Sequence, residues 1–400
     1  MTPSRSRLLW IAPEKQGGIQ SYSDVLWPEV REKWVEAGFP VCEALHAPLR
    51  TERDVNDSIE KLVRIEPSLI HVQHEYGLFG SKIPGRYSFP GWLKKVRAAL
   101  PKARVILTGH SVFDFSYRYP VQARGWQTPM RALTNAFFIR HFARYWNFQT
   151  WGKVDGVIVH SRHQLATVEK SRAPRFTTIP HFVPATRNAE HKIHESLKSI
   201  PQGSKKVVVF GYFTPEKGQD IALRAFQALG KSFRTGLSLI LAGGLRRAQD
   251  RAFHERCLAQ ARELGISDRV WTTGYVDPEY LEGLYGMADL VLAPFRETSG
   301  SGTLAQAFAH GMPVLASDLP LNQEITEREP GCLAFFRSED PEDCAVKVKE
   351  LLANDPARET LKAAARRYAE KCAPARIAEE HVRFYQEVLN GAAGGSEHAV

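Results

Sequence analysis

Cysteine is scarce in this chain and is not arranged for a structural role. The 400 residues include five cysteines, with no CxxC pair and no Cys/His spacing typical of zinc ligands. They are Cys42, Cys257, Cys332, Cys344 and Cys372. This pattern speaks against a zinc module and a disulfide framework, and it favours a reducing cytoplasm.

Long apolar runs are also missing. Near the N-terminus, Leu8 to Ala12 is a run of only five apolar residues before Pro13, too short for a signal peptide core or a membrane span. We therefore expect no targeting segment and a cytoplasmic protein. A hydrophobic content of 43% and a charged content of 24% are ordinary for a globular chain, so long disorder and fibrous repeats are not indicated.

Acidic residues are outnumbered by basic ones. The chain has 53 Lys and Arg against 44 Asp and Glu, a net charge of +9 that attracts anions. Charge alone leaves nucleic acid, an anionic lipid surface and phosphorylated substrates open as partners. Nucleic acid is the weakest of these, because the excess is modest for the length and no recognition motif is present.

Short apolar runs alternate with longer amphipathic stretches along the whole chain, which predicts parallel β-α-β layering. The expected strands are 7–12, 39–45, 69–74, 104–107, 154–160, 206–210, 237–242, 269–274, 290–294 and 313–316. Because 400 residues exceed one ordinary core, we expect two doubly wound α/β domains in tandem.

A polar stretch closed by Pro201 and Gly203 separates the two domains and is typical of a linker. From Asp355 to Leu389 the chain is expected to be helical with an interruption at Pro374. The predicted organisation is a first domain 1–184, a linker 185–204, a second domain 205–375, a helix 376–390 that could pack back on the first domain, and a tail 391–400.

Ligands of open α/β sheets bind beyond the carboxyl ends of the strands, so the loops after the strands are the candidate sites. After the first strand, Gly17 and Gly18 let backbone amides approach an anion at a helix start, and a plain tight turn is an equal alternative. After the first strand of the second domain, Lys217 beside Gly218 can reach a diphosphate; the alternative is a solvated lysine in a turn.

Two further loops carry unusual residues. The segment 294–304 runs from a strand end into small residues and a helix, where Ser299 to Thr303 could wrap a phosphate and Glu297 could accept from sugar hydroxyls. An ordinary helix N-cap is the alternative, and the glutamate beside five small residues favours function. His110 follows the fourth strand and could donate to a phosphate or a sugar hydroxyl, or merely pack.

These loops stand in an order that resembles the retaining glycosyltransferases of family 4, the glycosyl transferases group 1. The resemblance rests on GGIQSY, VQHEYGLFG, TGHS, VIVHS, TTIPHFV, GYFTPEKG, LILAGG, DRVWTTGYV, ADLVLAPF and AQAFAHGMPVLASD, which together cover nearly the whole chain. The last four are the most specific.

The resemblance implies a GT-B fold, in which two Rossmann-like domains face each other across a cleft. It implies retaining transfer of a sugar from a nucleotide diphosphate sugar, held mainly by the second domain, to a saccharide, lipid-linked or other hydroxyl acceptor held by the first. In such enzymes charge stabilisation and closure assist departure of the diphosphate, so neither a metal nor another cofactor is expected.

The resemblance also assigns residues. Lys217 matches the diphosphate-binding lysine, His110 the active-site histidine of the first domain, and Gly18 the loop facing the donor phosphates. The expected catalytic residues are His110 and Glu297, and the expected donor-binding residues are Gly17, Gly18, Gly211, Lys217, Arg246, Tyr275, Val276, Thr298, Ser299, Gly300, Ser301, Gly302, Thr303 and Gln306.

Two positions depart from the family pattern. The family usually has two glutamates eight positions apart, whereas this chain has Thr298 and Gln306 there, with Glu297 one place earlier. Gln306 can still donate and accept toward ribose hydroxyls. The basic residue that often follows the first glycine of GYFTPEKG is Tyr212 here, so Lys217 is expected to bind the diphosphate with help from Arg246 or Arg247.

The stretch 116–146 holds five arginines and no acidic residue, interleaved with aromatic residues. It could contact a membrane surface or a lipid diphosphate acceptor, which would make the protein peripheral to the inner face of the membrane. A core-packing helix with solvated arginines is slightly favoured, because the apolar and basic positions segregate imperfectly.

Three alternatives to glycosyl transfer use the same donor pocket. A nucleotide-sugar epimerase or a phosphorylase would have this fold. A nucleotide-sugar-binding protein without turnover is conceivable because of the altered glutamate pair. Product analysis with and without an acceptor separates these hypotheses.

Overall fold

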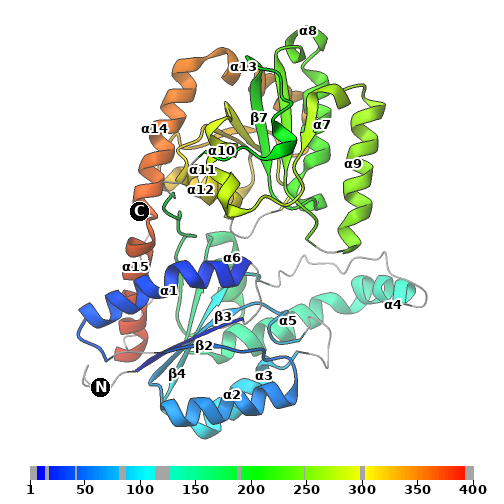
Figure 1. Ribbon diagram of the computed structural model, residues 1–400. Coiled ribbons are helices and arrows are strands. Elements are labelled where there is room, and N and C mark those ends of the chain that lie inside the picture. The colour runs from blue at the N-terminus through cyan, green and yellow to red at the C-terminus, as the bar shows by residue number, and fades with distance from the viewer. Residues whose placement is uncertain are drawn as a thin grey trace. The chain divides into compact units, whose positions relative to one another are not determined.

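The computed structural model describes residues 7–13, 18–40, 43–80, 87–112, 127–186, 191–246, 248–297 and 302–391. The chain folds as two compact units (Figure 1). The first consists of Met1–Pro180 with Pro374–Val400, and the second is His181–Ala373. The division thus falls after Pro180, a few residues before the stretch that we expected to be the linker.

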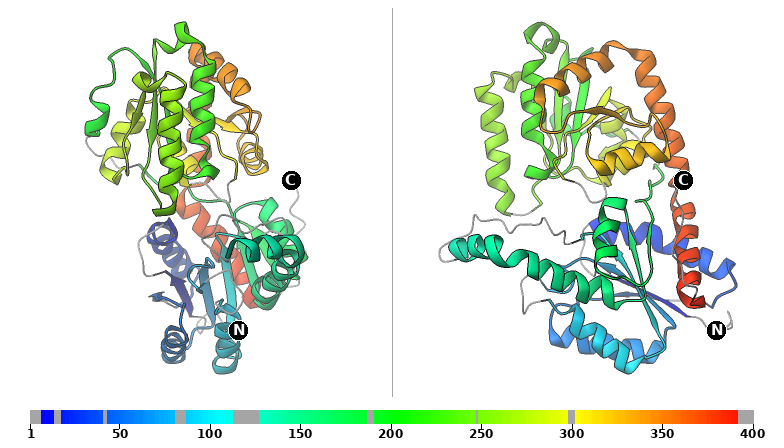
Figure 2. Two further views of the ribbon diagram at one scale, coloured as in Figure 1. Left: turned by 90° about the vertical axis from the view of Figure 1, so that its right-hand side faces the viewer. Right: turned by 180° about the vertical axis from the view of Figure 1, so that it is seen from behind.

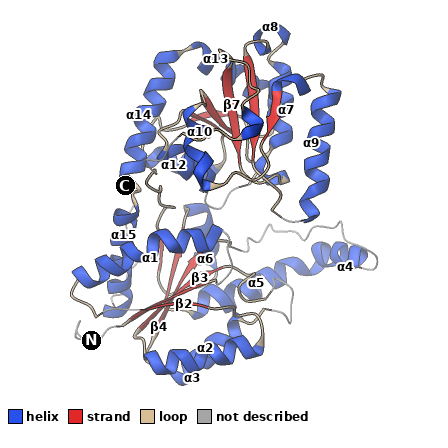
Figure 3. Cartoon of the chain, in the orientation of Figure 1, coloured by secondary structure: helices blue, strands red, loops and turns tan. Residues whose placement is uncertain are grey.

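The first unit is built on a parallel six-stranded sheet of order β2-β1-β3-β4-β5-β6 (Figure 3). Every residue of β1 and of β3 is buried, as expected where helices cover both faces of a parallel sheet. The strands are β1 (Leu8–Ala12), β2 (Glu43–His46), β3 (Leu69–His74), β4 (Arg104–Gly109), β5 (Gly156–Val159) and β6 (Phe176–Thr178).

Helices connect these strands, and the last helix of the chain joins the same unit, where α15 packs across α1 (Figure 1). Lys33 of α1 and Glu379 of α15 form an ion pair of 3.6 Å. The helices are α1 (Gly18–Glu36), α2 (Glu52–Ile65), α3 (Phe89–Ala99), α4 (Gln127–Leu133), η2 (Thr134–Phe138), α5 (Ile139–Thr150), η3 (Trp151–Lys153), α6 (Arg162–Lys170) and α15 (Pro374–Asn390).

The second unit has a parallel six-stranded sheet of order β12-β11-β10-β7-β8-β9. Its strands are β7 (Lys205–Phe210), β8 (Leu237–Ala242), β9 (Val270–Thr272), β10 (Leu290–Ala293), β11 (Val314–Ser317) and β12 (Ala334–Phe336). Its helices are η4 (Glu195–Leu197), η5 (Pro215–Lys217), α7 (Gln219–Ala228), α8 (Lys231–Arg234), η6 (Ala248–Asp250), α9 (Arg251–Glu263), η7 (Ser267–Arg269), η8 (Pro278–Tyr280), α10 (Leu281–Gly286), α11 (Gly302–Ala309), α12 (Pro320–Arg328), α13 (Pro341–Ala353) and α14 (Asp355–Lys371).

All ten strands predicted from the sequence are present, some with shifted ends, and the doubly wound α/β class is confirmed for both units. The sequence missed β6 and β12. Each has only three residues, mostly half-buried, and lies at an edge of its sheet. A continuous apolar run is therefore not required there, and the pattern that marks central strands is missing.

The second half of the expected linker packs on the second unit. Leu197 and Ile200 are buried in a hydrophobic cluster with Val208 of β7 and Ile240 of β8. Residues 187–190 lie outside the described residues. Polar composition predicted an exposed linker for 185–204, but its few apolar side chains cover one face of the second sheet.

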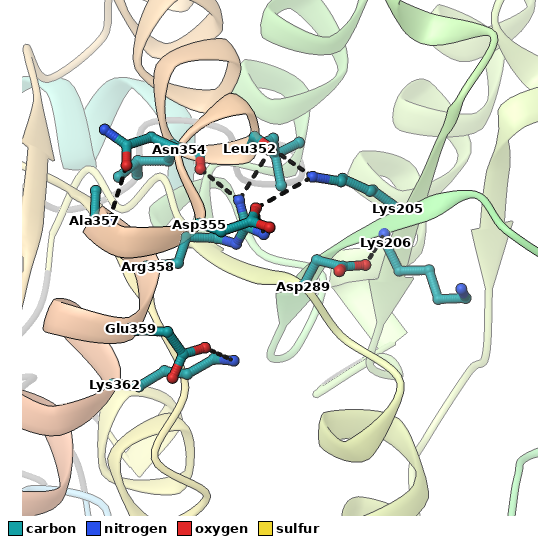
Figure 4. A network of polar contacts seen from close by, with 11 residues as sticks. Lys205, Lys206, Asp289, Leu352, Asn354, Asp355, Ala357, Arg358, Glu359 and Lys362 are labelled. Atoms are coloured by element: carbon teal, nitrogen blue, oxygen red, sulfur yellow. Dashed lines mark hydrogen bonds and ion pairs between the residues drawn. The ribbon is translucent and has the colours of Figure 1, made fainter.

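The amino end of β7 is held by a network of polar contacts (Figure 4). Lys205 donates to the carbonyl oxygen of Leu352 at 2.6 Å and lies 3.8 Å from the Asp355 carboxylate. Arg358 donates to the carbonyl oxygens of Leu351 and Leu352 at 2.7 and 3.0 Å, so it satisfies the open C-terminal carbonyls of α13. The charged side chains at the amino end of β7 are therefore paired within the fold.

Candidate functional site

In the second unit, the candidate site lies where the strand order reverses. β7 and β10 are neighbours, but β7 leads through α7 to β8 on one side, and β10 leads through α11 to β11 on the other. Their carboxyl ends form the switch point at which open α/β sheets bind ligands. The loop 211–218 and the loop after β10 both begin at this point.

Gly218 lets these two loops approach each other closely. Its φ of 68° is in the left-handed region, and a Cβ atom there would lie 1.8 Å from the carbonyl oxygen of Pro294 at the end of β10. Such a contact cannot relax by a side-chain rotation, because the obstacle is backbone. Only glycine therefore fits at this position.

Arg296 fastens the β10 loop to the β7 loop. Its guanidinium donates to both carboxylate oxygens of Asp220 at 2.8 Å and to the carbonyl oxygen of Pro215 at 2.8 Å. Burial raises the pKa of Asp220, but the hydrogen bonds and charge of Arg296 outweigh it and lower that pKa. The ion pair thus holds the segment around Lys217 at the switch point.

The Lys217 ammonium lies over the ring of Phe295, with 3.9 Å from Nζ to the ring centroid. The pKa of Lys217 is lowered to about 8, chiefly by burial; the charge of Glu216 opposes the shift, and the positive charge of Arg246 adds to it. Among the residues that the structure describes, no carboxylate forms an ion pair with the Lys217 ammonium. A cation in this setting favours an anionic ligand.

Thr303 and Gly211 complete the surroundings of this lysine. A Cβ atom on Gly211 would lie 3.4 Å from Thr303 Oγ1 and 3.6 Å from both Cδ and Cε of Lys217. Thr303 is in the first turn of α11, which begins at Gly302. The start of a helix, a hydroxyl and the side chain of Lys217 thus lie around one glycine, an arrangement that suits a phosphate.

The loops after β8 and β9 lie at the same carboxyl end of the second sheet. A Cβ atom on Gly243 would lie 1.9 Å from the carbonyl oxygen of Gly211, and Gly243 forms an isolated bridge with Gly274. A Cβ atom on Gly244 would lie 3.0 Å from the Tyr275 nitrogen. The two glycines of LILAGG therefore let the loops after β7, β8 and β9 approach each other, and Arg246 follows two residues after Gly244.

The remaining residues that we expected to bind the nucleotide-sugar donor differ in their solvent exposure. Tyr275 is 59% exposed, whereas Val276 is buried in the hydrophobic cluster of Val208 and Ile240, so only its backbone is suited to face a ligand. Glu297 is exposed and Gln306 is half-buried. Gly17, Thr298, Ser299, Gly300 and Ser301 lie outside the described residues.

In the first unit, His110 lies just past β4, as predicted. Its Nε2 atom is 2.8 Å from Oε1 of Gln73, and its ring makes an edge contact with Tyr22 of α1 at 4.8 Å between centroids. His160, just past β5, is 5.3 Å from the His110 ring. The sequence did not single out Gln73, Tyr22 or His160; a buried glutamine within an apolar strand was the available signal.

Glu75 and Gly18 lie at the same strand ends of the first unit. Glu75 follows β3 and accepts a hydrogen bond of 2.5 Å from the Ser111 hydroxyl, next to His110. Gly18 begins α1, as the loop prediction requires. The loops after β3, β4 and β5 thus carry Glu75, His110 and His160.

The helical stretch 127–150 corrects the favoured interpretation of a core-packing helix. Trp146 and Thr150 are buried, but the part before them projects from the first unit, as α4 does in both figures (Figures 1 and 2). Its exposed apolar side chains, each about half or more exposed, are Met130, Leu133, Phe137, Phe138 and Tyr145. Only the last turns of α5 pack as expected.

Two absences among the described residues bear on the class of protein. No helix there is long and apolar enough to cross a bilayer. Across the same residues, no three His, Cys, Asp or Glu side chains gather as metal ligands would. The four cysteines that the structure describes, Cys257, Cys332, Cys344 and Cys372, are buried and form no disulfide.

Comparison with known proteins adds relatives for both units. The profile of the family described as "Glycosyl transferases group 1" matches residues 192–368. The chain is 26% identical over 302 residues to a D-inositol 3-phosphate glycosyltransferase of Mycolicibacterium smegmatis, covering 73% of this chain and 62% of that protein. It is 30% identical over 208 residues to the protein of that name in Corynebacterium diphtheriae, covering 51% and 47%.

Solved structures resemble the fold along nearly the whole chain. HepE of Anabaena, in complex with UDP and glucose, superposes with a TM-score of 0.67 at 14% identity, covering 96% of this chain and all of that one. A sucrose-phosphate synthase of Thermosynechococcus elongatus gives a TM-score of 0.66 at 18% identity, covering 97% of this chain and 100% of that one. The predicted resemblance to the family 4 glycosyltransferases is confirmed.

The matched stretches cover about half to three-fifths of these curated relatives, so the relatives identify a domain and a fold rather than a substrate. Residues 192–368, most of the second unit, match the glycosyl transferases group 1 profile, and the chain as a whole has the GT-B fold.

Proposed function

We propose that the protein is a retaining glycosyltransferase that moves a sugar from a nucleotide diphosphate carrier to a hydroxyl acceptor. The observation that carries the proposal is the Lys217 ammonium at the switch point of the second unit, with Arg246 as a second positive charge and Thr303 beside it. Two cations near a helix start suit a diphosphate better than any neutral ligand.

The chemistry follows from where negative charge develops. As the bond between the sugar and the diphosphate breaks, charge accumulates on the leaving phosphate oxygens, where Lys217, Arg246 and the backbone amides at the start of α11 would stabilise it. These groups supply the positive charge that other transferases take from a metal, so the proposal includes no metal. In this mechanism the acceptor oxygen attacks the face that the diphosphate leaves, which retains the anomeric configuration.

His110 and Glu297 would act on the sugar. In the proposal, His110 contacts a hydroxyl of the transferred sugar, and Glu297 accepts hydrogen bonds from sugar hydroxyls. Gln306 would face the ribose, where an amide can both donate and accept. UDP sugars are the first donors to test, because HepE, which shares the fold, holds UDP and glucose.

Donor binding and transfer need separate measurements. We expect UDP, GDP or ADP and one of their sugars to raise the Tm of the whole chain, and the same sugar to appear in an acceptor product. His110→Ala should reduce transfer at least about tenfold while donor affinity stays within about twofold. Donor binding without transfer or hydrolysis would support the binding-protein alternative, and an altered free sugar nucleotide would support the epimerase.

We further propose that the acceptor is lipid-linked and that the projecting stretch 127–150 contacts an anionic membrane surface. The sequence of this stretch contains three arginines and no acidic residue, and its exposed apolar side chains suit the headgroup boundary. The chain should sediment with vesicles that contain phosphatidylglycerol but not with neutral vesicles.

A variant pair tests the role of the exposed side chains. Phe137→Ser should lose most vesicle binding, whereas Val63→Ser on α2, where the side chain is 46% exposed, should not. Equal binding by both variants, or a wild-type chain that ignores anionic vesicles, would contradict the membrane contact.

A further inference from the structure

A chain of buried polar side chains runs through the first unit and ends at His110. Tyr385 of α15 lies 2.5 Å from Nδ1 of His71, and Nε2 of His71 lies 3.3 Å from Nε2 of Gln73. Oε1 of Gln73 then lies 2.8 Å from Nε2 of His110. The contacts link the last helix of the chain to the loop after β4.

These side chains are cut off from water. His71, Gln73 and Tyr385 are fully buried in β3 and α15. The hydroxyl of Thr108 in β4, also buried, lies 2.8 Å from the same Nε2 atom of His71 and can donate to it. Burial lowers the pKa of His71 well below its usual value, and the neighbouring His381 lowers it further. His71 is therefore neutral, with one ring nitrogen that donates and one that accepts.

The atoms that face each other set the direction of donation. The amide nitrogen of Gln73 only donates, so Nε2 of His71 accepts from it and Nδ1 of His71 carries the proton toward Tyr385. With its nitrogen committed to His71, Gln73 turns its oxygen to His110. That oxygen only accepts, so Nε2 of His110 is the atom that donates.

We propose that Gln73 is a positioning residue that holds His110 as the Nε2–H tautomer and fixes the orientation of its ring. The inference deepens the proposed function, since it rests on His110 acting in sugar transfer. In the neutral ring, Nδ1 then carries the lone pair, so any hydrogen bond that this atom makes with a sugar hydroxyl is one that it accepts. The sequence alone had suggested donation by this histidine.

Other groups also face the His110 ring and belong to its electrostatic environment. Tyr22 packs against it from α1, and burial raises the pKa of that hydroxyl, which keeps it neutral. His160 approaches from the loop after β5, and Glu75 lies at Ser111, the next residue. A test of Gln73 must therefore compare variants that leave these three groups in place.

The tautomer can be measured without any turnover. The full chain labelled with ¹⁵N-histidine reports which ring nitrogen carries the proton, and the His110 signals are those that His110→Asn removes. In the wild type we expect a single Nε2–H form of neutral His110. Gln73→Met should convert it to a mixture of tautomers, and Gln73→Glu should restore the Nε2–H form and shift the His110 titration to higher pH, because a carboxylate favours the imidazolium.

A matched control removes another buried glutamine of the same unit. Gln164 of α6 accepts from the backbone N–H of His160 at 3.1 Å and not from its ring, so Gln164→Met should cost similar stability but leave the His110 tautomer unchanged. The positioning role is overturned if His110 is already a mixture in the wild type, or if Gln73→Met and Gln164→Met give the same spectra.

Activity then separates this inference from the function on which it rests. We expect Gln73→Met to lower kcat about tenfold with little change in donor KM, and Gln73→Glu to move the pH profile of kcat with the His110 titration. If the spectra change as expected but the chain transfers no sugar, the proposed function fails while the tautomer assignment stands.

Discussion

A lysine lies near each end of β7, and the two lysines differ in whether their charge is paired within the fold. At the amino end, Lys205 donates to a backbone carbonyl at 2.6 Å and pairs with Asp355 (Figure 4). Just past the carboxyl end, the Lys217 ammonium lies over the Phe295 ring, with no such carboxylate in the described ranges. At the amino end of β7 the charges are paired within the fold, whereas the carboxyl end presents positive charge that a bound anion can neutralise.

The glycines at the two ends differ in the same way. Gly203, just before β7, has a φ of 81° and no atom within 4 Å of the position that a Cβ atom would take. At Gly218, the same position lies 1.8 Å from the Pro294 carbonyl oxygen. The amino end needs glycine only for a turn. The carboxyl end needs it because two loops must touch to bring Lys217 to the switch point.

The largest expected effect sharpens this contrast in stability. Gly218→Ala should lower the free energy of unfolding by about 3 kcal/mol or more, from the left-handed backbone and the clash together. Gly203→Ala should lower it by about 1 kcal/mol, from backbone conformation alone. Urea unfolding of the two variants checks the pair, and equal losses would mean that the loops do not pack as described.

The next effect compares the two lysines in binding. Lys217→Ala should weaken donor binding by about 1.5 to 3 kcal/mol, the worth of a hydrogen bond to a charged group. Lys205→Ala should leave donor affinity unchanged, since its partners are within the fold. Calorimetric titration with the donor nucleotide tests both, and unchanged affinity in the Lys217 variant would remove this residue from the site.

A smaller effect on donor binding is expected from replacing the arginine near the carboxyl end of β7, compared with the arginine near its amino end. Arg296→Met should release the loop after β10 and weaken donor binding by about 1 to 2 kcal/mol, because Asp220 loses both hydrogen bonds. Arg358→Met at the amino end should lower the Tm without changing donor affinity. If both variants lower only the Tm, the Arg296 pair has no part in shaping the site.

The smallest effect is a pH dependence at the carboxyl end alone. Lys217 is charged below its pKa of about 8, so donor affinity should be highest below that pH and fall by at most about tenfold per pH unit above it. Lys217→Arg should abolish the fall, because a guanidinium stays charged. A decline that persists in this variant must come from another group.

Much of this contrast was visible in the sequence. Central strands of parallel sheets are buried on both faces, so their apolar runs marked ten of the twelve strands. The positions of the glycine loops and of Lys217 followed from those runs, since a loop at the carboxyl end of a strand has a fixed place in the sheet. The edge strands β6 and β12 were not predicted, because a strand at the edge of a sheet does not require a continuous apolar run.

The exposure of the projecting helix could not be predicted in the same way. Its apolar and basic residues are compatible with core packing and with a surface, because a helical pattern shows which residues share a face but not what that face meets. Phe137 is 67% exposed and Trp146 is buried, although both lie in one aromatic stretch. Only the path of the chain around the unit separates them.

The sequence by itself determined the two doubly wound sheets and the location of a candidate anion site, because burial period and glycine placement act over a few neighbouring residues. The tertiary structure alone decided which charges are satisfied and how His110 is oriented. Lys205 meets Leu352 across 147 positions, and Tyr385 meets His71 across 314. Hydrogen-bond partners at such separations are chosen by packing, and no local pattern encodes them.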